Sequence, residues 1–528
     1  MLAAMPARPN IIVIVADDLG FSDVGCYGAE IQTPNIDRLA TEGLRLTQFY
    51  NNAVCAASRA SILTGLYPRF GQVRDNQLVT LTDDSLERRA QQRGGILRSN
   101  MVTIAEVLQQ AGYATVMSGK WDLGGYSPTR PIDRGFQEFY GVMVGAVNHF
   151  DPTLPDPPGI NHGGPPQPFV HNATPVTSVP KDFYDTDAFV DHAVGQIRQL
   201  SKGDRPYFLH LAFTAPHYPM QARPEDIARY KGYYRDGYGV LRQERYRRLV
   251  ELKLISEKWK LPPPDRKLGD ASYDIEPAPW NSLADHEWES AKMEVYAAMV
   301  DRMDQGIGRI MATLKETGTD ENTLVIFFSD NGGCASEYSE AAYHAYKEGL
   351  PPGTRKDSYF LCGPGWATVQ SSPFRRFKTW TYEGGISTPM IVRWPAGHVR
   401  KGIDTQTVGH VVDIMPTLLD VAGTNYPARF AGNEILPAEG ISLKPALVDG
   451  MISADREFGW YLYGNRAYRS GKWKIVWGVT AKRWELYDLD ADRTETNDLA
   501  VQHPEIVRRL TASWRTWAQR SEVDQDLK

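Results

Sequence analysis

Continuous apolar runs alternate with amphipathic patterns along most of the chain. The runs "NIIVIVADD" at 10–18 and "NTLVIFFSDNGG" at 322–333 are continuously apolar over most of their length and contain β-branched residues, which is typical of strands buried on both faces of a sheet. Helical spacing extends from Pro34 to Gly43, and a longer amphipathic pattern covers 289–317. Alternation of strands with helices predicts an α/β fold with a large, mostly parallel mixed sheet flanked by helices.

Some segments depart from this alternation. Residues 151–184 are rich in Pro, Gly and Asn, and they are expected to form a long surface loop. Residues 222–290 are charged, with interspersed Tyr and Trp, and predict a helical or irregular insertion. Short strand patterns after about residue 454 predict a small antiparallel sheet. We therefore expect a catalytic α/β domain over 1–453 that contains both insertions, and a C-terminal subdomain over 454–528 with a small antiparallel sheet and a terminal helix.

The composition narrows the possible partners. The chain has 528 residues, is 42 % hydrophobic and 23 % charged, and carries a net charge of −6. A net negative charge argues against a nucleic-acid or membrane-surface partner, and no apolar run reaches the roughly 18 residues that a membrane span needs. The four cysteines do not form a disulfide framework in so long a chain. The beginning of the sequence has no pattern of an export signal, so we expect a cytoplasmic protein.

Polar side chains follow four of the apolar runs. They are Asp17 and Asp18, Lys120 with Asp122, His217, and Asp330 with Asn331. Because the carboxyl ends of parallel strands line one edge of a sheet, these residues are expected to converge. Three carboxylates and an amide oxygen form a hard ligand set that suits Ca²⁺ or Mg²⁺.

Taken singly, each of these residues has a structural interpretation as well. The Asp17–Asp18 pair could cap a helix, and Asn331–Gly332 is a strong turn signal. A lone lysine or a histidine between prolines, such as His217, is usually structural or solvated. Only their joint occurrence at strand ends favours a functional site.

Cys55 lies at the expected start of a helix, four residues before Arg59. The two side chains would lie one turn apart on the same face, and the helix N-terminus would attract an anion. A thiol at this position is expected to have a lowered pKa, which makes a cysteine nucleophile one candidate. A buried structural cysteine is the alternative, and a soft thiolate matches a hard-cation site poorly.

The segment "CAASRASILTG" at 55–65 resembles the signature of the type I sulfatases, which belong to the alkaline phosphatase superfamily. Further blocks resemble those of the family in the same order, and the resemblance extends from about residue 9 to about residue 499. Among the members, the bacterial cytoplasmic arylsulfatases are the most similar. These blocks are "PNIIVIVADDLGFSDVGCYG", "SGKWDLGG", "DRGFQEFYG", "FTAPHYPMQA", "FFSDNGG" and "TYEGGISTPMIVRWP".

The resemblance implies a function for each matching residue. Cys55 would be oxidised by a formylglycine-generating maturation enzyme, and the hydrated aldehyde, oriented by Arg59, would attack the sulfur of a small-molecule sulfate ester. Lys120, His217 and Lys378 would hold the sulfate and the leaving oxygen. The resemblance further implies a Ca²⁺ site, and the residues that match its ligands are Asp17, Asp18, Asp330 and Asn331, with residue 55 facing the same ion.

Two positions depart from the family pattern. Ala57 stands where the signature usually has proline, which bears on how well Cys55 is converted. Asp122 stands where the family usually has the histidine that contacts the formylglycine and serves as a base. Asp122 is interpreted either as an adapted base or as a sign of a weakened site. The alternatives to a sulfatase are a phosphonate or phosphate ester hydrolase on the same scaffold, and a catalytically weakened homologue that binds ligand.

Overall fold

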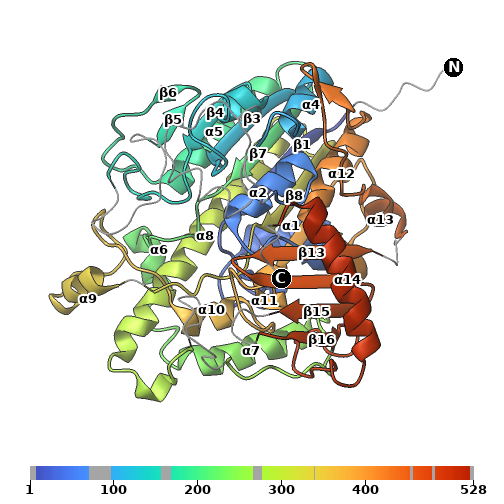
Figure 1. The fold of residues 1–528 in the computed structure, drawn as a ribbon. Coiled ribbons are helices and arrows are strands. Elements are labelled where there is room, and N and C mark those ends of the chain that lie inside the picture. The colour runs from blue at the N-terminus through green and yellow to red at the C-terminus, as the bar shows by residue number, and fades with distance from the viewer. Residues whose placement is uncertain are drawn as a thin grey trace.

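A ten-stranded mixed sheet forms the centre of the computed structural model, and a separate four-stranded antiparallel sheet is formed by the C-terminal region (Figure 1). None of the helices in the described part of the chain is long and apolar enough to cross a membrane. The described residues are 8–69, 97–155, 168–265, 276–337, 339–451, 456–477 and 482–523.

The central strand β1 (Asn10–Ala16) lies between β7 (Tyr207–Ala212) and β8 (Thr323–Ser329), and it is parallel to both. The strand order is β10-β2-β9-β8-β1-β7-β3-β4-β5-β6. Strand β9 (Ser387–Arg393) is antiparallel to β8 and β2, so the sheet is mixed, as predicted. The remaining strands of this sheet are β2 (Leu44–Tyr50), β3 (Ala114–Lys120), β4 (Glu138–Val142), β5 (Phe169–His171), β6 (Thr174–Pro175) and β10 (Gly402–His410).

Helices cover both faces of the main sheet. Side chains of β1 alternate between two apolar clusters: Ile12 and Ile14 pack on one face, and Ile11 and Val13 pack on the other. This arrangement confirms the prediction from the continuous apolar strands. The helices of the first face are α1 (Pro34–Glu42), α5 (Asp185–Leu200) and α8 (His286–Glu316), and those of the second are α2 (Cys55–Thr64), α4 (Ile104–Gln110) and α12 (Ile414–Ala422).

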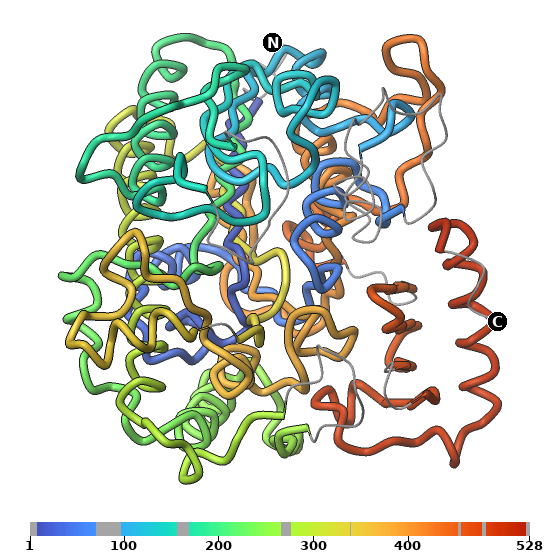
Figure 2. Tube along the Cα trace, turned by 60° about the vertical axis from the view of Figure 1, so that its left-hand side comes forward, coloured from blue at the N-terminus to red at the C-terminus, as the bar shows by residue number. Residues whose placement is uncertain are grey.

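The C-terminal antiparallel sheet is covered on one face by the terminal helix α14 (Pro504–Arg520), as Figures 1 and 2 show. Trp514 and Trp517 of the helix pack against Tyr468 and Ile475 of the sheet. The small sheet and the terminal helix confirm the predicted elements, whereas a domain boundary at residue 453 stays a prediction. The strands are β13 (Glu457–Leu462), β14 (Asn465–Ser470), β15 (Trp473–Trp477) and β16 (Trp484–Asp488).

The predictions for the two insertion segments compare differently with the structure. The loop prediction for 151–184 is wrong in part, because β5 and β6 add to the edge of the main sheet; residues 156–167 lie outside the described ranges. Two helices lie within 222–290, α6 (Pro224–Ala228) and α7 (Gly237–Glu251), and residues 266–275 lie outside the described ranges. That this segment is an insertion stays a prediction. The other elements are α9 (Glu340–Lys347), α10 (Pro364–Gln370), α11 (Glu383–Ile386), α13 (Lys444–Asp449), β11 (Arg429–Phe430) and β12 (Asn433–Glu434), with short 3-10 helices at Gly25–Tyr27, Pro131–Arg134, Trp280–Ser282 and Val411–Asp413.

Candidate active site at the carboxyl edge of the sheet

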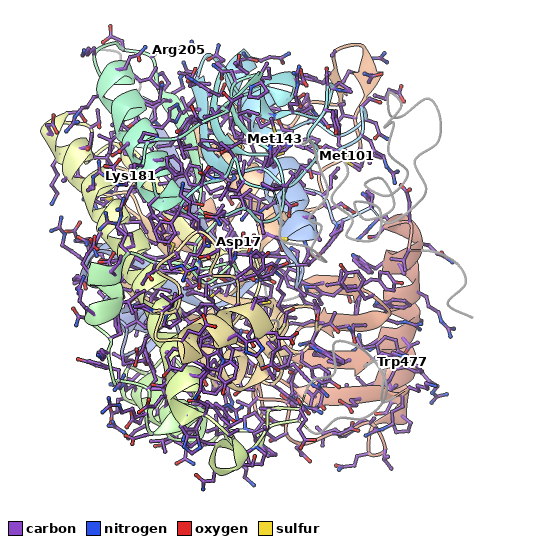
Figure 3. The ribbon with its side chains drawn as sticks, turned by 90° about the vertical axis from the view of Figure 1, so that its left-hand side faces the viewer. Asp17, Met101, Met143, Lys181, Arg205 and Trp477 are labelled. Carbon is purple, nitrogen blue, oxygen red and sulfur yellow. The ribbon has the colours of Figure 1, made fainter. Side chains whose placement is uncertain are left out.

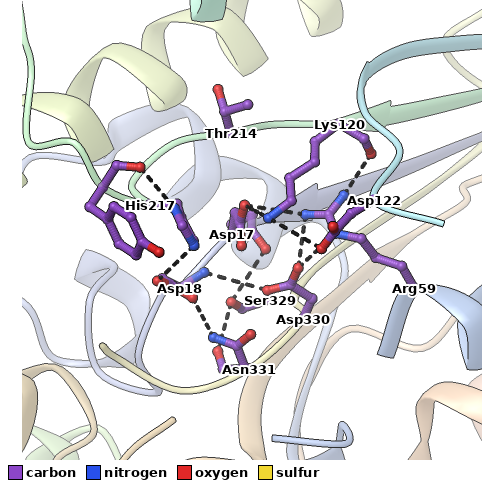
Figure 4. Close-up of polar contacts among 12 residues, drawn as sticks. Asp17, Asp18, Arg59, Lys120, Asp122, Thr214, His217, Ser329, Asp330 and Asn331 are labelled. Carbon is purple, nitrogen blue, oxygen red and sulfur yellow. Dashed lines mark hydrogen bonds and ion pairs between the residues drawn. The ribbon is translucent and has the colours of Figure 1, made fainter. Parts of the chain in front are cut away.

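The polar residues that follow the strands converge at one edge of the main sheet, as predicted (Figure 4). Figure 3 shows that Asp17 lies in the interior of the molecule, well away from Trp477 on the C-terminal sheet. Asp122 and Lys378 are partly exposed to solvent, and all other members of this group are buried. The group consists of Asp17 and Asp18 after β1, Lys120 and Asp122 at the end of β3, His217 after β7, Asp330 and Asn331 after β8, and Lys378 before β9.

Several oxygen atoms of this cluster lack a hydrogen-bond partner. Asp17 Oδ1, Asp18 Oδ2 and Asn331 Oδ1 are buried and accept no hydrogen bond from the described residues. Asn331 Nδ2 donates to Asp18 Oδ1 at 2.7 Å, which holds the amide oxygen beside the carboxylates. Burial raises the pKa of Asp17 to about 8, and the charge of Asp330 adds to this effect. Unsatisfied, buried hard oxygens are costly in the absence of a cation, so the donor set fits Ca²⁺ or Mg²⁺.

Basic side chains surround the carboxylates. Lys120 Nζ lies 2.5 Å from Asp17 Oδ2, and Lys378 Nζ lies 2.5 Å from Asp18 Oδ1. Arg59 Nη2 lies 2.8 Å from Asp330 Oδ2, and Arg59 Nη1 donates to the carbonyl oxygen of Lys120 at 2.8 Å. The three basic residues thus lie where an anionic group near the carboxylates would meet concentrated positive charge.

Cys55 is the first residue of α2 and lies one turn before Arg59, as predicted. The prediction of a lowered thiol pKa is wrong. Burial raises the pKa of Cys55 to about 12, and the charge of Asp122 acts in the same direction. The helix N-terminus cannot offset the loss of hydration at a residue that is 3 % exposed. The unmodified thiol therefore stays protonated at neutral pH and is a poor nucleophile.

His217 and Asp122 lie on opposite sides of the carboxylate cluster. His217 Nδ1 is 2.8 Å from the carbonyl oxygen of Tyr218, and Nε2 is 3.6 Å from Asp18 Oδ2. Asp122 Oδ2 is 3.8 Å from Lys120 Nζ. The side chain of Asp122 is 11 % exposed, so it lies at the boundary between the buried cluster and solvent.

His217 is supported by a group of residues that the sequence alone did not indicate. His149 Nδ1 is 3.0 Å from Asp185 Oδ2, and His149 Nε2 is 3.1 Å from the carbonyl oxygen of His217. Thr214 Oγ1 donates to Asp185 Oδ2 at 2.6 Å. Burial lowers the pKa of His149, but the charge and hydrogen bond of Asp185, together with the hydrogen bond to the His217 carbonyl, outweigh burial and raise it. No spacing in the sequence links these residues, because they come from separate connections that meet only in the fold.

Left-handed backbone occurs at four non-glycine positions in or next to the site. Asp18 has φ 66°, Ala53 has φ 61°, Asp122 has φ 57° and Thr379 has φ 75°. Non-glycine residues adopt this conformation at a cost, and such residues gather where the surroundings must hold a functional geometry. Two of the four are candidate site residues, and Thr379 directly follows Lys378.

The comparisons with known proteins show the family of the chain. A family model described as sulfatase matches residues 9–424, and a model described as N-sulphoglucosamine sulphohydrolase, C-terminal, matches residues 375–518. The chain therefore belongs to the sulfatase family, and it is a sulfuric ester hydrolase. The predicted family and enzyme class are confirmed.

Particular relatives cover most of the chain. It is 35 % identical over 532 residues to an uncharacterized sulfatase of Schizosaccharomyces pombe, covering 96 % of this chain and 93 % of that protein. It is 35 % identical over 460 residues to an arylsulfatase of Klebsiella aerogenes, covering 84 % and 92 %. The structure of Ps i-CgsB in complex with k-i-k-neocarrahexaose superposes with a TM-score of 0.66 at 24 % identity, covering 97 % and 93 %. This last likeness confirms the fold.

Proposed function

We propose that the protein hydrolyses sulfate monoesters with a formylglycine made from Cys55 and a Ca²⁺ ion held by Asp17, Asp18, Asp330 and Asn331. The main support is one observation. Buried oxygen atoms without hydrogen-bond partners, the start of α2 and three basic side chains meet at one edge of the sheet. Aryl sulfates are the first substrates to test, because the Klebsiella aerogenes relative is named an arylsulfatase.

Each residue would perform a defined task. The hydrated aldehyde of formylglycine would supply a hydroxyl nucleophile, and Ca²⁺ would supply positive charge beside it. Arg59 is held by Asp330 and by the Lys120 carbonyl, so it would orient residue 55 from the next turn of α2. Lys120 and Lys378 would bind sulfate oxygens, and His217 Nε2 would give a proton to the leaving alcohol oxygen.

Asp122 would accept a proton at residue 55. Burial is the largest cause of the raised pKa of the Cys55 thiol, and the charge of Asp122 is the second. The Asp122 carboxylate is therefore close enough to residue 55 to interact with it electrostatically. A carboxylate next to the cationic Lys120 can be ionised and act as a base. The interpretation as an adapted base therefore has more support than a weakened site.

Maturation would precede folding of this segment. Cys55 is 3 % exposed and Ala57 is 1 % exposed, so a maturation enzyme could not reach the thiol in the folded chain. The predicted partnership with such an enzyme thus concerns the nascent chain, in which Ala57 is part of the recognised segment. The cytoplasmic location stays a prediction.

The proposal is tested with the matured protein and matched aryl esters. We expect hydrolysis of an aryl sulfate, loss of this activity on chelation, and recovery on addition of Ca²⁺. A higher kcat/KM for an aryl phosphodiester would assign the site to phosphate ester chemistry instead. Tight binding of the aryl sulfate without turnover, in a sample fully converted at Cys55, would support a binding homologue.

A further inference from the structure

A second group of potential metal ligands lies at the edge of the main sheet, apart from the candidate active site. Glu138 begins β4, His171 ends β5, and His192 lies on α5. Their candidate ligand atoms all lie within 4.8 Å of one another. Glu138 is paired with Val116 of β3, whereas Lys120 is paired with Val142. Four residues along a strand correspond to about 13 Å, so the two sites are separate.

The two histidines point at one carboxylate oxygen. His171 Nε2 is 2.6 Å and His192 Nε2 is 3.3 Å from Glu138 Oε1. The elements β4, β5 and α5 therefore present one oxygen and two nitrogens to the same point.

Surrounding side chains orient these groups. His192 Nδ1 is 2.6 Å from Ser118 Oγ, which is buried in β3 and can accept a hydrogen bond from the Nδ1–H group of His192. Asn172 Nδ2 donates to Glu138 Oε2 at 3.1 Å. The Tyr140 ring packs beside both imidazoles, with its centroid 5.2 Å from that of His192 and 5.8 Å from that of His171. Partners of this kind fix the tautomer and the orientation of metal-binding side chains.

The three residues differ in how far they are buried. Glu138 and His192 are partly buried, whereas His171 is exposed. The His171 side chain is 53 % exposed, which leaves one side of the group open to water.

We propose that Glu138, His171 and His192 form a second cation site for Zn²⁺ or a similar divalent transition metal. Two imidazole nitrogens and one carboxylate are ligands that Zn²⁺ prefers, with water completing the coordination, whereas the active-site cluster offers hard oxygens that suit Ca²⁺. The bound ion links β4, β5 and α5, so it joins the edge of the sheet to the helix that covers it. This site is independent of the proposed reaction.

The test is a calorimetric titration of the full-length protein with Zn²⁺, after chelation and saturation of the active site with Ca²⁺. We expect one Zn²⁺ per chain in the wild type and none at this site in the double variant His171→Ala/His192→Ala. Ser118→Ala is expected to weaken Zn²⁺ binding by about tenfold or more, since it removes the partner of His192 Nδ1.

The matched control is His503→Ala. His503 Nδ1 is 3.6 Å from Glu505 Oε1, so this position has a histidine–glutamate pair but belongs to no group of three ligands within the described residues. It should leave Zn²⁺ binding unchanged. Glu138→Gln preserves the size of the side chain and provides a second test if the double variant does not fold. Equal Zn²⁺ binding by the wild type and Glu138→Gln, or no binding by the wild type, would reduce the group to an ordinary ion pair and overturn the proposal.

The expected consequence of binding is a higher Tm. Zn²⁺ should raise the Tm of the wild type and of His503→Ala, and it should not raise that of Glu138→Gln. An equal rise in all three proteins would contradict a site at Glu138.

Discussion

Two buried charged clusters of this molecule differ in how completely their polar atoms are paired. In the active-site cluster, Asp17 Oδ1, Asp18 Oδ2 and Asn331 Oδ1 have no hydrogen-bond partner among the described residues. The second cluster joins α11 to the C-terminal sheet, and here every carboxylate oxygen has a partner. Lys474 Nζ binds Glu383 Oε1 at 2.9 Å and Glu495 Oε1 at 2.8 Å.

The remaining oxygens of the second cluster are satisfied by neighbouring groups. Arg493 Nε lies 2.7 Å from Glu383 Oε2, and the Glu383 backbone N–H donates to Glu495 Oε2 at 2.8 Å. Both clusters are almost inaccessible to solvent, so burial of charge alone does not distinguish them. Incomplete pairing distinguishes the two clusters. A fully paired cluster can only stabilise the fold, whereas unpaired oxygens are available to a ligand.

The largest expected effect is on stability, from Lys474→Met. This change leaves two buried carboxylates without their shared cation and should lower the free energy of unfolding by about 3–5 kcal/mol, measured by urea denaturation. Lys472→Met is the matched control, because Lys472 is 46 % exposed and bonds Asp488 at the surface, which should cost less than about 1 kcal/mol. If both variants lost the same free energy of unfolding, the buried second cluster would stabilise the fold no more than a surface ion pair does.

The next effect is on catalysis, from Arg59→Lys. A lysine cannot reproduce the guanidinium contacts with Asp330 and with the Lys120 carbonyl, so we expect kcat to fall by about 10²–10³-fold with an aryl sulfate. Arg38→Lys, at a side chain that is 53 % exposed, should leave kcat unchanged. Full activity of Arg59→Lys would remove this residue from the site.

Calcium should stabilise the protein by binding at the active-site cluster alone. At a concentration of 100 times Kd, Ca²⁺ should add about 2.7 kcal/mol to the free energy of unfolding of the chelated protein. Lys474→Met should gain as much as the wild type does, while Asn331→Ala should gain less. An equal gain in Asn331→Ala would place the ion elsewhere.

The smallest effect is expected from Asp122→His. Both side chains can accept a proton, so kcat/KM for the aryl sulfate should change by less than about tenfold. Asp122→Asn, which cannot act as a base, is the control and should lose most of the activity. A gain of much more than tenfold in Asp122→His would show that Asp122 weakens the site.

The main sheet could be predicted because its central strands are continuously apolar and each ends in polar residues. The apolar runs of β1 and β8 indicate strands that are buried on both faces, and in the structure both strands contribute side chains to the apolar cluster on each face of the sheet. Strands β5 and β6 could not be found in this way. They have three and two residues, and neither has a sequence pattern of its own. Strand β5 is held by pairing with β4, and β6 is held by pairing with β5.

The part of the site that could be predicted from the sequence consists of the residues that directly follow the strands. Asp17, Lys120, His217 and Asp330 converge because parallel strands share an edge. The raised pKa of Cys55 was not predictable, because it depends on burial that the whole fold creates. The contact of His149 with Asp185 was not predictable either, since it joins residues 36 positions apart without a recognisable spacing.

The most direct test of the account is the mass of the tryptic peptide Leu46–Arg59 from protein produced in a host that matures sulfatases. We expect the mass of an aldehyde in place of the thiol of Cys55, together with hydrolysis of aryl sulfates. An unmodified thiol would contradict it, because a buried thiol whose pKa is raised to about 12 cannot serve as the nucleophile.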